Sequence, residues 1–271
     1  ERRGLRVPGS ELVGLIPESS LLAAGRHYLA RAGQSAGVPR RQLIETAIQS
    51  LGLRDLGGFD PRQKVIEAAA GVGDGRLASM TNREFVDELS TDSPAPGGGS
   101  VAALCGAQAA ALTAMVANLT VGRKGYEAVQ ERVKALAEEA QEAKDAYLSA
   151  IDEDTDAFNR VMDAMRLPKA SPEQARARDL AVAAATREAT RVPLGVLERM
   201  PPLLALVREI AGIGNANSLS DAGVAALTAA AAAEGAYYNV LINLGALAAL
   251  DQSAEPGFAA QARQRAVAFE Q

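Results

Sequence analysis

Two long stretches of this 271-residue chain are almost free of charge and rich in alanine and glycine. Residues 93–122 carry no charged side chain, and residues 222–250 carry Glu234 alone. Both exceed the roughly 20 residues that a membrane span needs. They nevertheless contain amides such as Gln108 and Asn118 and lack Trp anchors, and helices that are apolar all round also occur at the centre of large soluble bundles. We therefore expect buried helices, with a membrane protein as the least favoured alternative.

Small side chains determine how such helices pack. An Ala-rich helix buries little apolar area, at about 25 cal/mol per Å². It must therefore contact many neighbours to offset the entropy lost when it becomes ordered. This favours a broad helical bundle that is buried further by self-association, and we predict a homo-oligomer, at least a dimer.

The charged and reactive residues restrict the possible chemistry. The net charge is -5 and no basic cluster is present, which disfavours a nucleic-acid partner. One cysteine, Cys105, and one histidine, His27, argue against a disulfide framework, a Cys/His metal site or a Ser-His-Asp triad within one subunit. No signal peptide precedes the first helix, so we expect a cytoplasmic protein whose N-terminus lies before Glu1. Any catalysis must use carboxylates, amides, hydroxyls and cations.

The chain changes character near residue 70. Before that point, residues 10–17 are typical of a short buried strand, and residues 18–32 and 39–51 of amphipathic helices. About 70 residues with a single strand bury little surface alone, so residues 1–70 either pack on the rest or belong to a larger α+β domain. A glycine-rich linker is predicted over residues 71–80.

Residues 81–271 are predicted to be helical throughout. Thr81 with Glu84, and Ser218 with Asp221, have the spacing of capping pairs, and Ser171 has the position of an N-cap. Prolines are expected to kink or break the chain at Pro193 and again at residues 201–202. The predicted fold class is mainly α: a bundle of long Ala-rich helices, with a small α+β fragment at the N-terminus. The predicted helices begin near residues 81, 97, 126, 172, 222 and 255.

One carboxylate interrupts the apolar face of a long predicted helix. From residue 126 to 165, apolar residues recur at intervals of three and four, and Asp154 occupies the same stripe. Burial would raise the pKa of this carboxyl group and make it a proton carrier near neutrality. A structural acid paired with a neighbouring cation or hydroxyl is the equally favoured alternative. Asp152, Glu153 and Asp156 lie off the stripe and are expected to be solvated.

Other polar residues cluster at predicted helix ends. Glycines 97–99 precede a helix and expose backbone N–H groups that favour an anion, although they are no P-loop and could simply form a turn. Arg123 and Lys124 follow the charge-free helix, where they either stabilise its C-terminus or bind a carboxylate. The amides in and before the last long helix serve either as interhelical hydrogen bonds or as ligand contacts.

Several motifs in order resemble the cyclodeaminase domain of formiminotransferase-cyclodeaminase. They are SPAPGGGSVAA from Ser93, TVGRKGY from Thr120, IDEDTDAF from Ile151, and then RLPK, ATRVPL, GNANSLSDAGVAA and NVLINL. This resemblance covers residues 81 to about 250. Residues 1–70, with GSELVGLIP, LGLRDLGGFDP and KVIE, are similar to the closing part of the formiminotransferase domain. Most of that domain is absent, and His27 matches no transferase motif, so transferase activity is doubtful in this chain alone.

The resemblance implies conversion of 5-formiminotetrahydrofolate to 5,10-methenyltetrahydrofolate and ammonia in histidine degradation. It implies no metal and no cofactor beyond the folate substrate, including its polyglutamylated forms. Asp154 matches the acid expected to move protons in that reaction. Arg123, Lys124 and Lys169 are candidates to hold the folate glutamate tail. The remaining candidate substrate-binding residues are Gly97, Gly98, Gly99, Ser100, Tyr126, Asn215, Asp221, Asn239 and Asn243.

Two alternative functions stand beside this one. The nearest is a methenyltetrahydrofolate cyclohydrolase, which uses water as a reactant. The other is a helical scaffold with an inert site, which would bind folate without turnover.

Overall fold

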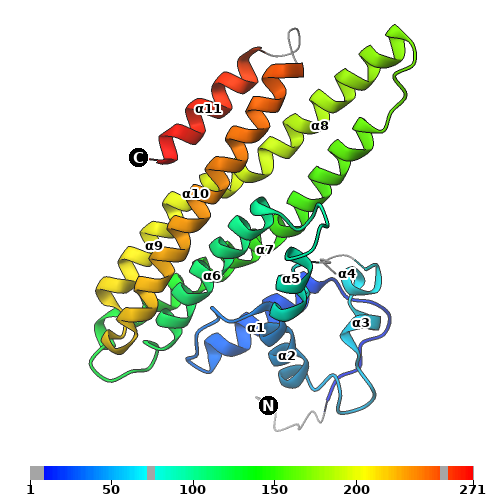
Figure 1. Ribbon diagram of the computed structural model, residues 1–271. Helices are drawn as coiled ribbons and strands as arrows, with labels where there is room; N and C mark the ends of the chain where they lie inside the picture. Colours follow the sequence, from blue (N-terminus) through cyan, green and yellow to red (C-terminus); the bar gives the residue numbers. More distant parts are fainter. Residues whose placement is uncertain (1–8, 72–76, 251–255, 271) are drawn as a thin grey trace.

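The structure is a computed structural model that describes residues 9–71, 77–250 and 256–270. Long helices dominate it (Figure 1). In the N-terminal part they are α1 (Glu18–Arg31), α2 (Arg40–Leu51), α3 (Pro61–Lys64) and α4 (Ile66–Ala69). The remaining helices are α5 (Asn82–Leu89), α6 (Gly98–Asn118), α7 (Gln130–Met165), α8 (Pro172–Glu198), α9 (Met200–Ile213), α10 (Leu219–Leu250) and α11 (Pro256–Glu270). The mainly α fold predicted from the sequence is confirmed.

The predicted strand over residues 10–17 does not form. Only Ile16 makes a β-bridge, a parallel one with Val65, and no longer strand occurs in the described ranges. Val13 is 89% exposed, so this segment is extended but not buried. The short apolar run was therefore a poor guide here, because a strand requires a partner strand, and in the described ranges only Val65 pairs with this segment. The α+β character predicted for the N-terminal fragment is reduced to this single bridge.

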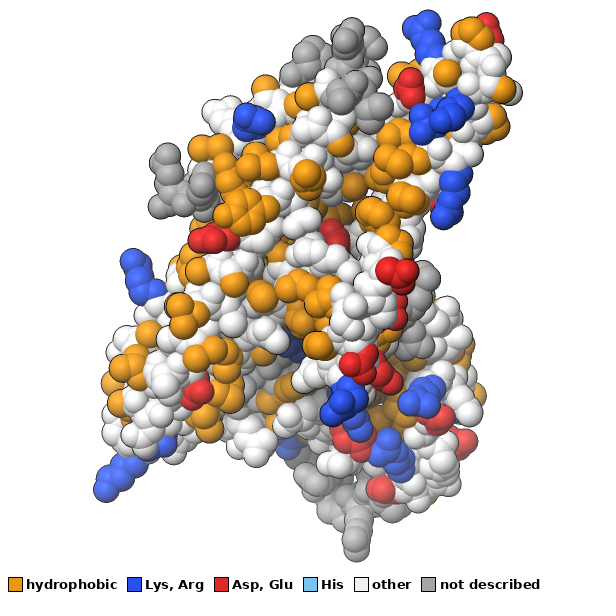
Figure 2. Space-filling view, in the orientation of Figure 1, with side chains coloured by type: hydrophobic (Ala, Val, Ile, Leu, Met, Phe, Trp, Pro, Cys, Tyr) orange, Lys and Arg blue, Asp and Glu red, His pale blue; other side chains and the backbone are white. Residues whose placement is uncertain are grey.

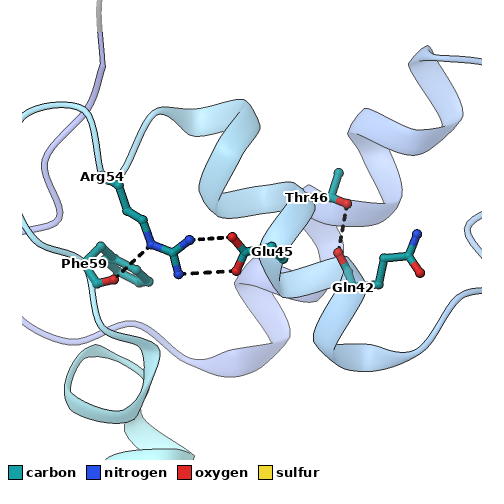
Figure 3. Close-up of polar contacts among 5 residues, drawn as sticks. All are labelled: Gln42, Glu45, Thr46, Arg54 and Phe59. Atoms are coloured by element: carbon teal, nitrogen blue, oxygen red, sulfur yellow. Dashed lines mark hydrogen bonds and ion pairs between the residues drawn. The ribbon is translucent and has the colours of Figure 1, made fainter.

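The N-terminal unit, residues 9–71, is held by a small core of its own and by surface polar contacts. Leu21, Ile48 and Phe59 belong to the same buried cluster. Figure 3 shows Arg54 pairing with the carboxylate of Glu45 on α2 while its Nε donates to the Phe59 carbonyl oxygen at 3.4 Å. These groups are exposed, so each contributes only a few tenths of a kcal/mol to about 1 kcal/mol. The apolar cluster accounts for most of this unit's stability.

The helical bundle is built around α6. This helix packs against α7 and α10, and α8 closes the arrangement by contacting both α7 and α10. Close approach is possible because Ala103, Ala109 and Ala110 on α6 and Ala225 and Ala229 on α10 are fully buried. In the described ranges, α6 is the one helix long and apolar enough to cross a membrane, and 61% of its apolar window is buried inside the protein. A core helix has the same properties.

Helix ends follow the predicted caps in two cases. Thr81 with Glu84 forms a capping box at α5, and Ser171 with Gln174 forms one at α8. The chain breaks between α8 and α9, where α9 begins immediately before prolines 201 and 202. Helix α10 begins at Leu219, directly after a short 3-10 turn that opens at Ala216.

Pro193, in contrast, neither kinks the chain into two helices nor ends α8. Because proline lacks an N–H, the carbonyl of Ala189, four residues earlier, has no partner in its own helix. Asn243 of α10 donates its side-chain N–H to that carbonyl oxygen at 3.1 Å. A side chain from the neighbouring helix thus replaces the missing backbone hydrogen bond, and α8 continues to Glu198.

The N-terminal unit docks on the bundle through the loop after α1. Asn118 of α6 and Gln141 of α7 both donate to the carbonyl oxygen of Gly37, at 2.6 and 3.4 Å. A Cβ atom at residue 37 would lie 2.3 Å from the Cβ of Ala137, which is closer than any real contact. Only glycine fits this junction, so the 1–70 segment packs on the bundle, as one of the two sequence-based alternatives predicted.

Candidate active site

Asp154 lies at the point where the apolar stripe of α7 leaves the core. Val133, Leu136, Tyr147 and Ile151 of this stripe are at most 1% exposed, whereas Met165 near the end of the helix is 45% exposed. Asp154 lies between these regions and is half-buried. Helix periodicity therefore predicted correctly that the Asp154 side chain lies on the core-facing side of α7, and this side chain is only partly buried.

The glycine-rich start of α6 lies directly against the Asp154 carboxyl group. The Ser100 hydroxyl donates to Asp154 Oδ2 at 3.0 Å, and Ser100 itself is fully buried. A Cβ atom at Gly99 would lie 2.2 Å from Asp154 Oδ1, so an alanine there would displace the carboxyl group. The backbone N–H of Ser100 also bonds to Asp154. The glycines thus let the first turn of α6 approach the acid closely, which links two motifs that are more than 50 residues apart.

Opposing effects act on the proton affinity of this group. Desolvation by burial raises the pKa of Asp154, and this is the largest effect; hydrogen bonds from the Ser100 side chain and backbone lower it by a smaller amount. No ion pair to Asp154 occurs in the described part of the chain. The net result is a raised pKa, as expected for a group that must both accept and release a proton.

Asn239 of α10 completes this end of the bundle. Its Nδ2 donates to the Gly235 carbonyl oxygen at 2.8 Å and lies 3.5 Å from the position of a Cβ at Gly98. The structure therefore brings together six predicted residues: Gly97, Gly98, Gly99, Ser100, Asp154 and Asn239. Asn243, one turn later, instead bonds to Ala189 on α8 and acts as an interhelical contact.

A second group of predicted residues forms a well-built loop at the opposite end of α6. The Thr120 hydroxyl accepts from the Asn215 backbone N–H at 2.9 Å, and the Tyr126 hydroxyl accepts from the Ala216 N–H at 3.0 Å. Gln130 Nε2 donates to the carbonyl oxygens of both Thr120 and Tyr126. These bonds fasten the loop over residues 120–126, here called the cation loop, to the start of α7 and to the turn before α10. Asp221 is half-buried in the first turn of α10.

The cation loop does not meet Asp154 within one subunit. Arg123 and Lys124 are exposed, between Gly122 and Gly125, which both have positive φ. Because α6 has 21 residues, the cation loop lies about 30 Å from the glycine-rich end of that helix. Lys169 is also remote: it is exposed near the tip of the α7–α8 hairpin (Figure 1).

Two polar residues near Asp154 were not among the candidate site residues. Thr155 Oγ1 lies 3.5 Å from the Ser100 hydroxyl. Of the three acids expected to be solvated, only Glu153 is exposed. Asp152 and Asp156 are half-buried, and Asp152 accepts from the Leu77 N–H at 2.9 Å, so the expectation was wrong for these two. The periodicity of α7 gave the direction of these side chains but could not indicate that the segment before α5 covers them.

Two further features limit which ligands this part of the protein can bind. No group of three potential metal ligands occurs within the described ranges. A surface pocket lies beside α5 and is lined by Glu84, Asp87 and Glu88 together with Ser79, Met80 and Thr91. Its three acids would repel an anionic ligand, so this pocket does not suit the carboxylates of a folate.

Comparison with known proteins places these observations in a family. Residues 81–264 match the family model described as formiminotransferase-cyclodeaminase, and residues 1–70 match the formiminotransferase domain. The chain belongs to the formiminotransferase-cyclodeaminase family. The family model covers the glycine-rich start of α6, Asp154 and the cation loop together.

Named relatives of this formiminotransferase-cyclodeaminase family member include animal and bacterial proteins. The formimidoyltransferase-cyclodeaminases of Mus musculus and Sus scrofa are both 36% identical, over 89% and 96% of this chain. These alignments span only 44% and 47% of the two relatives, so the chain corresponds to less than half of their length. A methenyltetrahydrofolate cyclohydrolase of Methylorubrum extorquens is 39% identical over 60% of this chain and 78% of its own.

One solved structure has the same fold. It is the formiminotetrahydrofolate cyclodeaminase of Thermotoga maritima, with a TM-score of 0.61 and 30% sequence identity. The match covers 72% of this chain and 91% of that one.

Proposed function

We propose that this chain is a formiminotetrahydrofolate cyclodeaminase, which converts 5-formiminotetrahydrofolate to 5,10-methenyltetrahydrofolate and ammonia. The observation that carries the proposal is the contact between Asp154 and the first turn of α6, in a chain that aligns with almost the whole of the T. maritima cyclodeaminase. A half-buried carboxyl group of raised pKa beside backbone N–H donors provides acid–base catalysis without a cofactor. Residues 1–70 alone are not proposed to catalyse formimino transfer.

The formimino group is a basic amidine that enters as its cation, C=NH2+, so one net proton transfer from N10 is enough to release neutral ammonia and leave the methenyl cation. N10 of the folate attacks the formimino carbon attached to N5, and a five-membered ring with a tetrahedral carbon forms. Asp154 removes the N10 proton and delivers it to the formimino nitrogen, whose bond to the carbon then breaks to release ammonia. The carbon remains bonded to N5 and N10 as the methenyl bridge. Ser100 holds the carboxyl group in position for both transfers.

Asp154→Asn tests this mechanism. The amide has nearly the same shape but cannot exchange the proton, so turnover should fall by about 10²- to 10⁴-fold, the usual contribution of acid–base catalysis. Ammonia release from 5-formiminotetrahydrofolate is the measurement, with circular dichroism to show that the fold is retained. Glu153→Gln is the matched control, because Glu153 is an exposed acid next to Asp154 on the same helix. Near-normal ammonia release by the Asp154→Asn variant would remove Asp154 from the mechanism.

A methenyltetrahydrofolate cyclohydrolase is the second candidate function. It is favoured by the M. extorquens relative, whose sequence aligns over 78% of its length. Both activities act on the same carbon between N5 and N10, and they differ in whether ammonia leaves or water is added. Absorbance of the methenyl group rises if the enzyme receives 5-formiminotetrahydrofolate and deaminates it. It falls if the enzyme receives 5,10-methenyltetrahydrofolate and hydrolyses it.

We also propose that the protein is a homo-oligomer, at least a dimer. Helix α10 carries exposed apolar side chains on one face: Val224 (47% exposed), Leu227 (72%), Tyr238 (62%) and Ile242 (70%). Met115 near the end of α6 and Leu119, the residue directly after that helix, are also exposed, and α6 packs against α10. We call these six residues the α10 face. In Figure 2 hydrophobic side chains gather over this part of the bundle with few charges among them, as in surfaces that associate with a partner.

A further inference from the structure

We propose that each folate site is completed by Arg123 and Lys124 of a second copy of the chain, packed antiparallel on the α10 face. This inference rests on the proposed function, because the folate's glutamate carboxylates are the ligands of the two cations. It explains why the predicted site residues form two groups at opposite ends of α6. A monoglutamyl folate is shorter than that helix, so no single subunit can use both groups on one molecule.

The cation loop is held in one conformation and presents two cations to the solvent, as a loop that binds an anion would. Hydrogen bonds from Gln130 and from the turn before α10 fix it at several points. Yet its two cations project into solvent, and neither forms an ion pair with another described residue. Cations that served only the C-terminus of α6 would not need a loop built in this way, because the interaction with a helix dipole needs proximity alone.

The glycine-rich end of α6 has a candidate proton carrier but no cation. Asp154, Ser100 and the backbone of glycines 97–99 contact one another, but no cation accompanies them among the described residues. Glu234 is exposed on α10, five residues before Asn239, and its carboxylate would repel those of the folate tail. This end can perform the proton transfer, but among the described residues no cationic side chain accompanies Asp154 to hold an anionic tail.

The α10 face connects these two ends and suits self-pairing. Its exposed residues run from Val224, near the cation loop, to Ile242, beyond the Asp154 end, at helical spacing. A two-fold axis perpendicular to α10 near Leu227, midway between the cation loop at Ala216 and the Asp154 end at Asn239, brings the face of one copy against that of the other. The same axis places the cation loop of each copy over the Asp154 end of its partner. Charges then match as well, because Glu234 of one copy approaches the cations of the other.

Subunit hybrids test the sharing of sites directly. Arg123→Ala/Lys124→Ala should lower kcat/KM by about 10- to 100-fold, chiefly through KM, because charged hydrogen bonds to the folate tail are lost. This double variant and Asp154→Asn are co-expressed with different tags, and only oligomers carrying both tags are isolated. In such a hybrid dimer one site keeps both the acid and the cations, so we expect about half of the wild-type kcat/KM.

Sites contained within one subunit give a different result. Every site of the hybrid would then carry one of the two defects, and activity would stay at the level of the parent variants, which would overturn the inference. Wild-type kcat/KM in the Arg123→Ala/Lys124→Ala variant would also overturn it. The control is Arg41→Ala/Arg62→Ala, which removes two exposed cations of the N-terminal unit and should leave kcat/KM unchanged.

Cross-linking gives a readout that does not depend on the proposed reaction. In a Cys105→Ser background, Lys124→Cys is placed in one copy and Ile242→Cys in the other. Mild oxidation of the mixture should yield covalent dimers containing one copy of each. Covalent dimers of Lys124→Cys with itself would indicate parallel packing and overturn the inference. If mixed dimers form while Asp154→Asn retains turnover, the proposed mechanism fails and the antiparallel pairing stands.

Discussion

Asp154 is a carboxyl group whose surroundings favour its neutral form. Burial raises the pKa of Asp154 in the folded state, whereas the unfolded chain has the ordinary value. Above the folded pKa the ionised group destabilises the fold, and this penalty disappears as the pH falls below the ordinary value. The residue is therefore retained at a cost in stability, as expected for a group with a functional role.

The same linkage predicts the stability of the Asp154→Asn variant. At neutral pH its free energy of unfolding should exceed that of the wild type, because asparagine replaces a desolvated carboxylate with a neutral isostere. The difference should shrink as the pH is lowered through the raised pKa and vanish below the ordinary one. Urea denaturation at a series of pH values measures it. A constant difference across the series would show that Asp154 does not titrate abnormally.

At the residue scale, the sequence predicted the acid and missed part of its surroundings. Asp154 stood out because it occupies an apolar stripe, and the fold confirms that the stripe faces the core. Its contact with Ser100 joins two helices and has no signature in the sequence of either. The expectation for Asp152 was wrong because the covering segment near Leu77 is distant along the chain.

At the element scale, Pro193 and Asn243 form a matched pair. The proline leaves the Ala189 carbonyl without its helical partner, and the asparagine on α10 supplies a donor. We expect Asn243→Ala to lower the free energy of unfolding by about 1–3 kcal/mol, the cost of leaving a shielded polar group unpaired.

A double-mutant cycle isolates this interaction. In a Pro193→Ala background, the restored N–H can bond to the Ala189 carbonyl, so Asn243→Ala should cost less than it does in the wild type. A coupling energy of about 0.5–3 kcal/mol is expected from equilibrium urea denaturation. Equal costs in the two backgrounds would show that Asn243 does not compensate for the proline.

Most helices could be predicted because periodicity and caps are local properties. The capping box of Thr81 and the glycine-rich start of α6 follow from residues within one turn. The helix does not break at Pro193, one of the two outcomes expected there, and the strand expected over residues 10–17 does not form, for the opposite reason. Each depends on a partner elsewhere in the chain: Asn243 is present and rescues the helix, whereas a full partner strand for Ile16 is not found in the described ranges.

At the scale of the whole molecule, the α10 face predicts that association and activity are linked. Leu227→Glu/Ile242→Glu introduces charges at two strongly exposed positions and should leave the fold of each subunit intact. Because each copy contributes the face, both charges appear twice in the interface. We expect monomers by light scattering and a fall in kcat/KM of about 10- to 100-fold, as for loss of the cation loop.

Leu180→Glu is the matched control. Leu180 is 52% exposed on α8 and lies outside the α10 face, so this variant should keep both the wild-type mass and its kcat/KM. A monomeric wild-type protein at micromolar concentration would contradict the proposed oligomer. Dissociated subunits with full turnover would show that each subunit is sufficient for catalysis.

Sequence motifs alone could not indicate how the candidate site is divided. The glycine run and the cation loop are close in sequence, at residues 97–100 and 120–126. Their order along the chain suggests that they belong to one site. A straight helix between them separates the two groups by its full length. This separation is a property of the fold and appears only when α6 is seen as one rigid element.

The junction at Gly37 has a consequence for the first 70 residues. Even a methyl group at residue 37 would collide with Ala137, and two amides from different helices hold the Gly37 carbonyl, so the N-terminal unit is anchored to α6 and α7 at this point. We expect a protein domain joined to that unit to keep one orientation relative to Asp154, in contrast to a domain on a flexible linker.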